Sequence, residues 1–303
     1  MPEPAPRGIL LVDKPGGITS HDVVARARRA LGTRKIGHAG TLDPMATGLL
    51  VLGVGPATRL LTYVVGLDKT YEATIRLGVS TDSDDADGEL TAQAEADAVA
   101  AVTRGRIEAG VAALTGEIDQ VPSRVSAIKV GGRRAYDLAR AGEEVELKAR
   151  RVTVSRFDVL EVCVTETATG GAVVDVDVVV DCTSGTYIRA LARDLGADLG
   201  VGGHLTALRR TRIGPFSVAD AATDLTPDVG LLRDAVVASS VLGSFEVTAD
   251  EARDLRHGKR LAGAAPRLSG EHPAAIDPEG HLVGIVERRG DDVKSLMNMP
   301  GDG

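Results

Sequence analysis

One stretch of the chain combines residue types that could do chemistry within a stiff bend. It reads Gly37-His38-Ala39-Gly40-Thr41-Leu42-Asp43-Pro44-Met45-Ala46-Thr47-Gly48. Glycine lets a backbone approach another surface closely, and Pro44 pushes Asp43 toward an extended conformation. Such a loop could hold the carboxylate of Asp43 in one fixed pose, as nucleophilic catalysis requires. The alternative is an ordinary Asp-Pro turn in which Asp43 caps its own backbone, and the spacing alone leaves both interpretations open.

The segments on either side of this loop must position it. Apolar residues recur at helical spacing in His21–Leu31, with Ser20 as the expected N-cap and Gly32 as the expected end. Residues 33–48 show no periodicity, which predicts a loop throughout. Short apolar runs predict buried strands at Ile9–Val12 and Leu49–Val54.

Later segments predict an α+β fold. Tyr71–Leu77 alternates apolar and polar residues, which indicates a half-buried strand with Tyr71 on its apolar face. Strands outnumber helices and most connections are short, so we expect a mixed, mostly antiparallel sheet with flanking helices. The other expected elements are helices at Thr103–Leu114, Arg134–Arg140 and Ile188–Leu199, a hairpin from Val125–Val130 turned by Gly131-Gly132, and strands near Arg151–Val164, Ala172–Cys182 and His204–Ile213.

The composition shifts after Phe216 to short acidic and Ala-rich stretches, followed by short strands with turn signals from Phe245 onward. We therefore expect a larger domain over residues 1–225 and a small β-rich domain over residues 226–303. No 18-residue apolar run and no signal-peptide pattern occur, so we expect no membrane span and a cytoplasmic protein. Cys163 and Cys182 are isolated, and their spacing predicts no metal site.

The net charge of −8 argues against a nucleic-acid partner only when the whole chain is summed. Residues 1–76 hold ten Lys and Arg against six Asp and Glu, a local charge of +4. A polyanion responds to nearby charge, because salt screens charges more than about 10 Å away. Arg26, Arg28, Arg29, Arg34 and Lys35 form a run without an acid, which indicates either a solvated helix face or contact with phosphates.

Several blocks of the sequence, in order, resemble the TruB family of tRNA pseudouridine synthases. The loop GHAGTLDPMATGLL is similar to the signature of that family, and the resemblance extends from about Gly8 to Phe216. The further blocks are Gly8–Pro15, Asp68–Tyr71, the acidic turn Thr81–Gly88, Gln120–Pro122 with Ser126–Lys129 and Arg134–Tyr136, Ser184–Arg189, and His204–Arg210. The C-terminal part bears a weaker resemblance to a PUA-like RNA-binding module, chiefly in Leu255–Leu261.

The resemblance implies a fold, a reaction and a partner. It implies the pseudouridine synthase fold with a small PUA-like C-terminal domain. The reaction is the isomerisation of uridine to pseudouridine at position 55 in the T-loop of tRNA, on a base that is flipped out of its stack. It also implies no cofactor and no metal, with tRNA as the partner of a monomer that needs no other protein. The sequence has no GxxxxGK[ST] motif and no GxGxxG after a strand, in agreement with that expectation.

The same resemblance implies roles for individual residues. Asp43 is the expected catalytic carboxylate, and Arg189 is the cation that orients it and keeps it ionised. Tyr71 is expected to stack on the flipped uracil and to transfer protons. On the residues alone, Arg189 could equally be a surface arginine at a helix start, and Tyr71 a core tyrosine.

Six further residues are expected to contact the substrate. His38 would fill the space that the extruded base leaves, Tyr187 would form a second wall, and Leu208 would close the pocket. Lys14 would support the pocket loop beside Pro15, and Arg34 and Lys35 would contact phosphates. Ala39 and Ser123 depart from the family pattern, which usually has Thr and Pro at these positions. The acidic turn Ser83–Gly88 lacks the ligand spacing of a calcium loop and is interpreted as a solvated turn.

Two other function classes remain as alternatives. The chain could be an RNA-binding or tRNA-folding module without chemistry, although such a binder has no use for a carboxylate that repels phosphate. It could also be a guide-RNA-dependent relative that acts with protein partners. A chemical label specific for pseudouridine discriminates these classes from a stand-alone isomerase.

Overall fold

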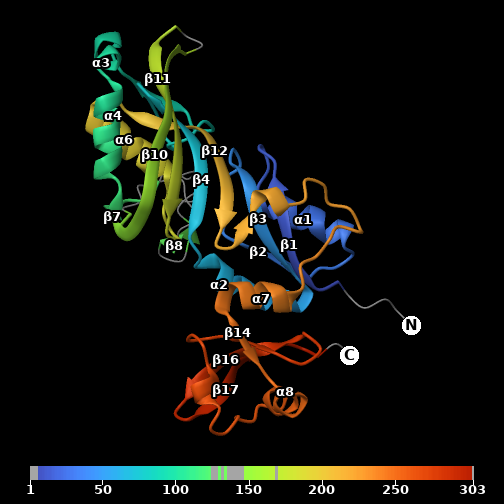
Figure 1. Ribbon diagram of the computed structural model, residues 1–303. Helices are drawn as coiled ribbons and strands as arrows, with labels where there is room; N and C mark the ends of the chain where they lie inside the picture. The colour runs from blue at the N-terminus through green and yellow to red at the C-terminus, as the bar shows by residue number, and fades with distance from the viewer. Residues whose placement is uncertain (1–5, 124–128, 131–132, 135–146, 168–169, 302–303) are drawn as a thin grey trace. The chain divides into compact units, whose positions relative to one another are not determined.

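A computed structural model describes residues 6–123, 129–130, 133–134, 147–167 and 170–301 (Figure 1). The chain forms two compact units. Unit 1 comprises Met1–Asp43, Gly48–Gly66 and Gly214–Gly303, and unit 2 comprises Pro44–Thr47 and Leu67–Ile213. The predicted domains, residues 1–225 and 226–303, are continuous segments and do not correspond to these two units, so the predicted division stays a prediction.

The N-terminal part of unit 1 consists of strands around a single helix. β1 (Gly8–Lys14) and β2 (Ile36–Ala39) each pair antiparallel with β3 (Thr47–Val54). Helix α1 (Ser20–Ala30) buries Val23, Val24 and Ala27 among the apolar side chains of these strands. Burial of each such valine or leucine contributes about 1.5–3 kcal/mol, so the helix face and the strands stabilise one another. The short helices η1 (Gly55–Leu60) and α2 (Leu61–Val65) follow β3.

Unit 1 is completed by the end of the chain. The segment after β13 (Phe216–Ser217) and η2 (Val218–Asp220) returns to β1, where Ile9 N donates to Leu232 O and Leu232 N to Ile9 O. Helix α7 (Asp234–Leu242) leads into a four-stranded sheet with its own apolar core. That sheet is formed by β14 (Ser244–Glu246), β15 (Ala274–Ile276), β16 (Leu282–Arg289) and β17 (Asp292–Asn298), with α8 (Ala249–Arg256) and η3 (Ala265–Arg267) between β14 and β15.

Unit 2 is built on an antiparallel sheet in which β4 lies between β11 and β12. The order is β12 (Gly203–Ile213), β4 (Lys69–Leu77), β11 (Ala172–Cys182), β10 (Arg150–Glu166) and β7 (Gly116–Gln120). Helices α4 (Arg104–Ala113) and α6 (Ile188–Leu199) lie along one face of this sheet (Figure 1). The apolar side chains of β4 alternate with polar ones, so one face of the strand is buried and the other is half-exposed.

Smaller elements complete unit 2. β5 (Val79–Thr81) pairs with β6 (Leu90–Gln93), and the acidic turn connects them. Helix α3 (Ala96–Ala100) follows β6, and β8 (Lys129–Val130) pairs with β9 (Arg133–Arg134).

The predicted α+β class and the mostly antiparallel sheets are confirmed. Among the predicted elements, α6 and β11 agree with the structure residue for residue. The helix expected at Arg134–Arg140 lies outside the described residues, except for Arg134, which belongs to β9. Within the described part of the chain, no helix is both long and apolar enough to cross a membrane.

Two local predictions were wrong. Residues 33–48 are not loop throughout, because Ile36–Ala39 forms β2 against β3. Ser20 is not the N-cap of α1, because Thr19 takes that position and forms a capping box with Asp22. The hydroxyl of Ser20 is therefore available for another contact.

Candidate active site

The loop that carries Asp43 is held at its start by Ser20. The Ser20 hydroxyl accepts a hydrogen bond from Leu42 N at 2.9 Å and donates one to Leu42 O at 3.2 Å. Both residues are buried, whereas the neighbouring Asp43 is partly exposed. Gly40 has φ of 78°, a conformation that favours glycine, just before this anchor. This role of Ser20 could not be predicted from the sequence, because its position also fits a helix cap.

The end of the loop is held within unit 2. The Thr47 hydroxyl donates to Leu208 O at 3.5 Å, and Arg209 Nη1 donates to the Thr47 hydroxyl at 3.4 Å. Leu208 itself is buried and lines a cavity of about 480 Å³. The other lining residues include Met45 and Thr47 from the loop, Glu72 and Thr74 from β4, and Leu160 from β10. Whether Leu208 closes a pocket over a base stays a prediction.

Lys14 and His38 are enclosed side chains of unit 1. Lys14 is fully buried at the end of β1, and its Nζ donates to Pro15 O at 2.9 Å and to Ile18 O at 2.8 Å. It therefore supports the turn after β1, while its place in a substrate pocket and its contact with substrate stay predictions. His38 lies in β2, half-buried, with its ring edge-on to His21 at a centroid distance of 5.4 Å.

The predicted phosphate contacts lie on the surface of unit 1. Arg34 and Lys35 are both exposed in the connection between α1 and β2. Arg28 has a structural role, because its Nη2 donates to Ile36 O at 3.0 Å. The exposure of Arg34 and Lys35 permits phosphate binding and equally fits a solvated segment, so their role stays a prediction.

Tyr71 lies in the middle of the unit 2 sheet. It faces Val180 of β11 and Arg210 of β12 across the two ladders, and its side chain is buried. Tyr187 is half-buried at the start of α6, where its backbone is held at both polar groups by Gln120. Gln120 Oε1 accepts from Tyr187 N at 2.8 Å, and its Nε2 donates to Tyr187 O at 3.0 Å.

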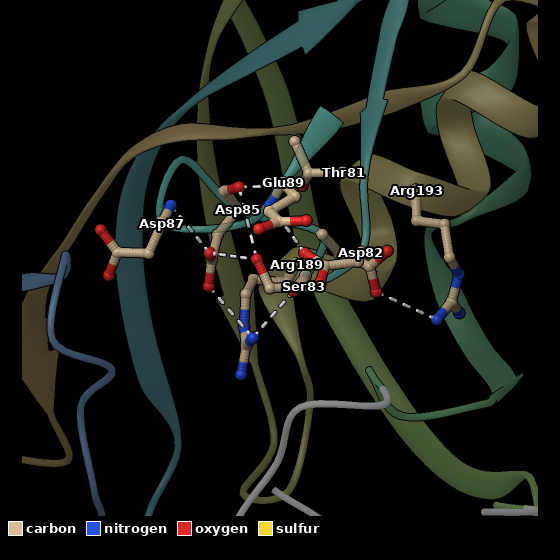
Figure 2. Close-up of polar contacts among 9 residues, drawn as sticks. Thr81, Asp82, Ser83, Asp85, Asp87, Glu89, Arg189 and Arg193 are labelled. Carbon is tan, nitrogen blue, oxygen red and sulfur yellow. Dashed lines mark hydrogen bonds and ion pairs between the residues drawn. The ribbon is translucent and has the colours of Figure 1, made fainter. Parts of the chain in front are cut away.

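Arg189 is not a surface arginine, because only 3% of it is exposed at the start of α6. Its Nη1 donates to Ser83 O at 2.9 Å and lies 3.1 Å from Asp85 Oδ2 (Figure 2). Asp85 is buried as well, so the two charges offset each other's cost of leaving water. The guanidinium is thus held in a fixed place by a carboxylate and a carbonyl that the sequence places far away.

The interpretation of Ser83–Gly88 as a solvated turn was wrong in its first half. Ser83, Asp84 and Asp85 are buried, and of the residues in this turn only Ala86 and Asp87 are exposed. The Asp85 carboxylate also accepts from the Ser83 hydroxyl at 2.6 Å and from Asp87 N at 3.1 Å. Asp85 is therefore a buried partner of Arg189 that the sequence reasoning missed. The available signal was Arg189 itself, since a buried arginine requires an acidic partner.

Two further titratable groups lie close to Tyr71 in the sheet. Lys69 is buried two residues before Tyr71, and burial, aided by the charge of Arg210, lowers its pKa to about 8. Cys182, its partner in β11, is buried too, and desolvation raises the pKa of its thiol to about 11. A lysine with such a pKa is partly neutral under mildly alkaline conditions.

One group in the described residues has the composition of a metal site. It consists of Asp277, Glu279 and His281 in the turn before β16. The Asp277 carboxylate is already engaged by Arg256 Nη2 at 2.8 Å and by His281 N at 2.8 Å. A capped turn with an ion pair accounts for this arrangement.

The predicted site residues thus fall into two sets. Unit 1 contains Lys14, Arg34, Lys35, His38 and Asp43, and unit 2 contains Tyr71, Tyr187, Arg189 and Leu208. Within unit 2, Arg189 meets Asp85, and Leu208 meets the end of the loop. The meeting of Asp43 with Arg189 and Tyr71 stays a prediction.

Comparisons with known proteins cover nearly the whole chain. Residues 28–188 match the family model described as TruB family pseudouridylate synthase (N terminal domain). Residues 189–233 match the model described as tRNA pseudouridylate synthase B C-terminal domain, and residues 243–300 match tRNA Pseudouridine synthase II, C terminal. The chain is 57% identical over 300 residues to "tRNA pseudouridine synthase B" of Leifsonia xyli subsp. xyli, covering 97% of each chain. It is 52% identical over 296 residues to the protein of that name from Thermobifida fusca, covering 97% and 99%.

Solved structures support the fold. A structure described as an H/ACA RNP bound to a substrate RNA containing 2′-deoxyuridine is similar with a TM-score of 0.68 at 23% identity, covering 97% of this chain and 85% of that one. A Cbf5-Nop10-Gar1 complex gives a TM-score of 0.66 at 24% identity, covering 98% and 84%. The fold, the ordered motifs and the full-length relatives agree, and the chain belongs to the TruB family of pseudouridylate synthases.

Proposed function

We propose that this chain isomerises uridine at position 55 in the T-loop of tRNA to pseudouridine, with Asp43 as the catalytic carboxylate. The observation that carries the proposal is the position of Asp43 directly after an anchored Leu42, in a segment that matches the TruB family model. A loop fixed in this way gives a carboxylate one pose and little freedom to lose when substrate binds. The relatives at 52–57% identity are named as tRNA pseudouridine synthases.

The proposed reaction is an intramolecular rearrangement. The N1–C1′ bond of the flipped uridine breaks, the uracil turns, and a C5–C1′ bond forms. N1 gains a proton and C5 loses one, so mass and charge are unchanged. Asp43 must be ionised to assist these steps, whether it adds to the sugar or to the base.

The remaining residues are proposed to hold the substrate and the carboxylate. Arg189, kept in place by Asp85, provides a fixed positive charge for Asp43. Tyr71 stacks on the uracil and is the proposed proton-transfer group, and Tyr187 and Leu208 form the other walls. His38 occupies the space of the extruded base, Lys14 supports the pocket, and Arg34 and Lys35 bind phosphates.

The alternatives concern the partner. A binder without chemistry would leave uridine unchanged, and a guide-RNA-dependent enzyme would need a guide and other proteins. The similar solved structures of RNP complexes share the fold with this chain and carry no argument about its partners. We propose a cytoplasmic monomer that modifies tRNA without an obligate protein partner and without a cofactor.

The first test is isomerisation by the purified chain alone. Uridine-containing tRNA is incubated with the protein, and a pseudouridine-specific chemical label reports the product. We expect labelling by wild type and none by Asp43→Asn, which has nearly the same shape without the charge. Asp97→Asn is the matched control, because Asp97 is exposed in α3. Absence of label with wild type would contradict the proposed function, and equal labelling by Asp43→Asn would contradict the role of Asp43.

A further inference from the structure

A second arginine of α6 meets the acidic turn one helical turn after Arg189. Arg193 Nη1 lies 3.4 Å from Asp84 Oδ2, and its Nη2 donates to Val121 O at 2.7 Å. Figure 2 shows Arg189 and Arg193 reaching the same turn from one helix. Residues four apart lie on the same helix face, so two adjacent carboxylates, Asp84 and Asp85, receive two successive arginines.

The backbone of Asp84 adopts a conformation that is unfavourable for a residue with a side chain. Its φ is 62°, and among the described residues it is the non-glycine residue with positive φ. Residues with a Cβ pay for this conformation, and aspartate and asparagine tolerate it better than most. Leu205 N donates to Asp84 O at 3.0 Å, which fixes the strained residue against β12. Strain of this kind persists where the surrounding structure over-determines it, often at functional sites.

The negative charge of Asp84 does not stabilise the folded chain. Burial raises the pKa of its carboxyl, and Asp194 adds to this, while Ser123, Arg193 and Arg189 offset only part of the effect. The charged carboxylate is therefore less favourable in the folded chain than in water, and its penalty is present at neutral pH and relieved as the pH falls. A residue that is strained and ionised at a cost calls for a function.

We infer that Asp84 and Arg193 are positioning residues that fix the orientation of α6, and with it the Arg189 guanidinium, for the proposed isomerisation. Apolar packing through residues such as Leu191 and Leu195 holds α6 against the sheet, and the ion pairs of Arg189 and Arg193 add two polar restraints on the side that meets the acidic turn. The pair of Arg193 with Asp84 therefore links α6 to the acidic turn at a second point one helical turn after Arg189. Arg193 also pairs with its neighbour Asp194 at 2.8 Å and donates to Val121 O, which ties the same point to the segment after β7. The inference rests on the proposed function, because it matters only if Arg189 orients a catalytic carboxylate.

Asp84→Asn is the informative variant, since asparagine tolerates positive φ and nearly preserves the shape. We expect its melting temperature to equal or exceed that of wild type, because the cost of the buried charge is removed. We expect kcat for pseudouridine formation to fall by about tenfold to a hundredfold, as a small misplacement of a catalytic group causes, with KM for tRNA unchanged. Asp87→Asn is the control, because its carboxylate is exposed on the same turn and points away from both arginines in Figure 2.

A second variant checks the partner. Arg193→Met should lower kcat to a similar degree, Arg193→Lys should restore part of it, and the double variant Asp84→Asn/Arg193→Met should be no slower than either single variant. An unchanged kcat in Asp84→Asn would overturn the inference. A lower kcat in Asp84→Asn that is accompanied by a lower melting temperature would also overturn it, because loss of folded protein would then explain the loss of activity. Failure of wild type to label tRNA would instead contradict the proposed function, so the two failures are distinguishable.

Discussion

Arg189 shows what a single residue requires from the rest of the chain. A buried guanidinium needs several acceptors, and this one uses a side chain and a carbonyl of the acidic turn. The sequence predicts that Arg189 belongs to the site through its resemblance to a family motif, yet it does not indicate which acid holds it. Asp84, Asp85 and Asp87 look alike in the sequence, and only the fold separates two buried carboxylates from an exposed one.

Lys69 gives a residue-scale prediction for the dependence of stability on pH. Its folded pKa of about 8 lies below the ordinary value of 10.5, so above pH 8 the unfolded chain holds more protons at this site than the folded chain. Stability contributed by Lys69 therefore rises with pH between these two values. Comparison of wild type with Lys69→Met by urea unfolding should show wild type gaining about 1 kcal/mol relative to the variant from pH 7 to pH 9.

The pH window for this measurement ends at 9 for a reason. The raised pKa of Cys182 makes stability fall as the pH rises above the ordinary thiol value, and because Lys69 lowers that pKa, the size of this fall differs between wild type and Lys69→Met. A free-energy difference between wild type and Lys69→Met that stays constant from pH 7 to pH 9 would contradict a depressed lysine.

At the scale of elements, the sequence predicts those helices and strands that are long and have a regular apolar pattern. The alternating valines of β11 and the apolar stripe of α6 are sufficient to predict the bounds of both elements, because one face of each is buried along its whole length. The strand β2 was missed, because four residues that include a glycine and a histidine show no alternation and are strand only through pairing with β3. The burial of the acidic turn was missed too, because α6, which covers it, follows about a hundred residues later.

The junction of α1 with the loop around Asp43 yields an element-scale prediction. Thr19 and Ser20 are adjacent hydroxyls with different tasks, one capping α1 and one holding Leu42. Thr19→Ala should cost about 1 kcal/mol of unfolding free energy. Ser20→Ala should cost about 1–3 kcal/mol, because a buried Leu42 N–H loses its acceptor.

The two variants should differ in catalysis rather than in stability. We expect Ser20→Ala to lower kcat, because the loop around Asp43 loses its anchor, while Thr19→Ala leaves kcat close to wild type. Urea unfolding and pseudouridine formation, measured on both variants, provide the comparison. A kcat lowered equally in both variants would mean that the loop depends on the helix end as a whole.

At the scale of the whole molecule, an acidic protein must bind a polyanion. The N-terminal segment carries positive charge at Arg34 and Lys35, both of which are exposed and form no ion pair with another described residue. The C-terminal run Leu255–Leu261 looks basic in sequence, but Arg256 pairs with Asp277 and Lys259 pairs with Asp254. Its field is thereby reduced, and we expect a smaller contribution to RNA affinity from this run than from the N-terminal segment.

The salt dependence of tRNA binding tests this distribution. Each phosphate contact that is lost should reduce the slope of log K against log salt by about 1. Arg34→Ala/Lys35→Ala should therefore weaken binding and flatten the slope by about 2, whereas Arg253→Ala/Lys259→Ala, at two exposed residues paired with acids, should change little. Equal effects from both double variants would contradict an N-terminal phosphate surface.

The hydrogen bonds between Ile9 and Leu232 have a consequence for biosynthesis. The first strand leaves the ribosome early, yet the backbone groups that cover it are translated roughly 200 residues later, which takes roughly 10–40 s at ~5–20 residues per second. β1 can pair with β3 soon after synthesis, and the residues of unit 2 that follow can begin to fold while the other edge of β1 still lacks its partner. The nascent chain must therefore keep the outer edge of β1 from pairing with other chains until the segment around Leu232 has been synthesised.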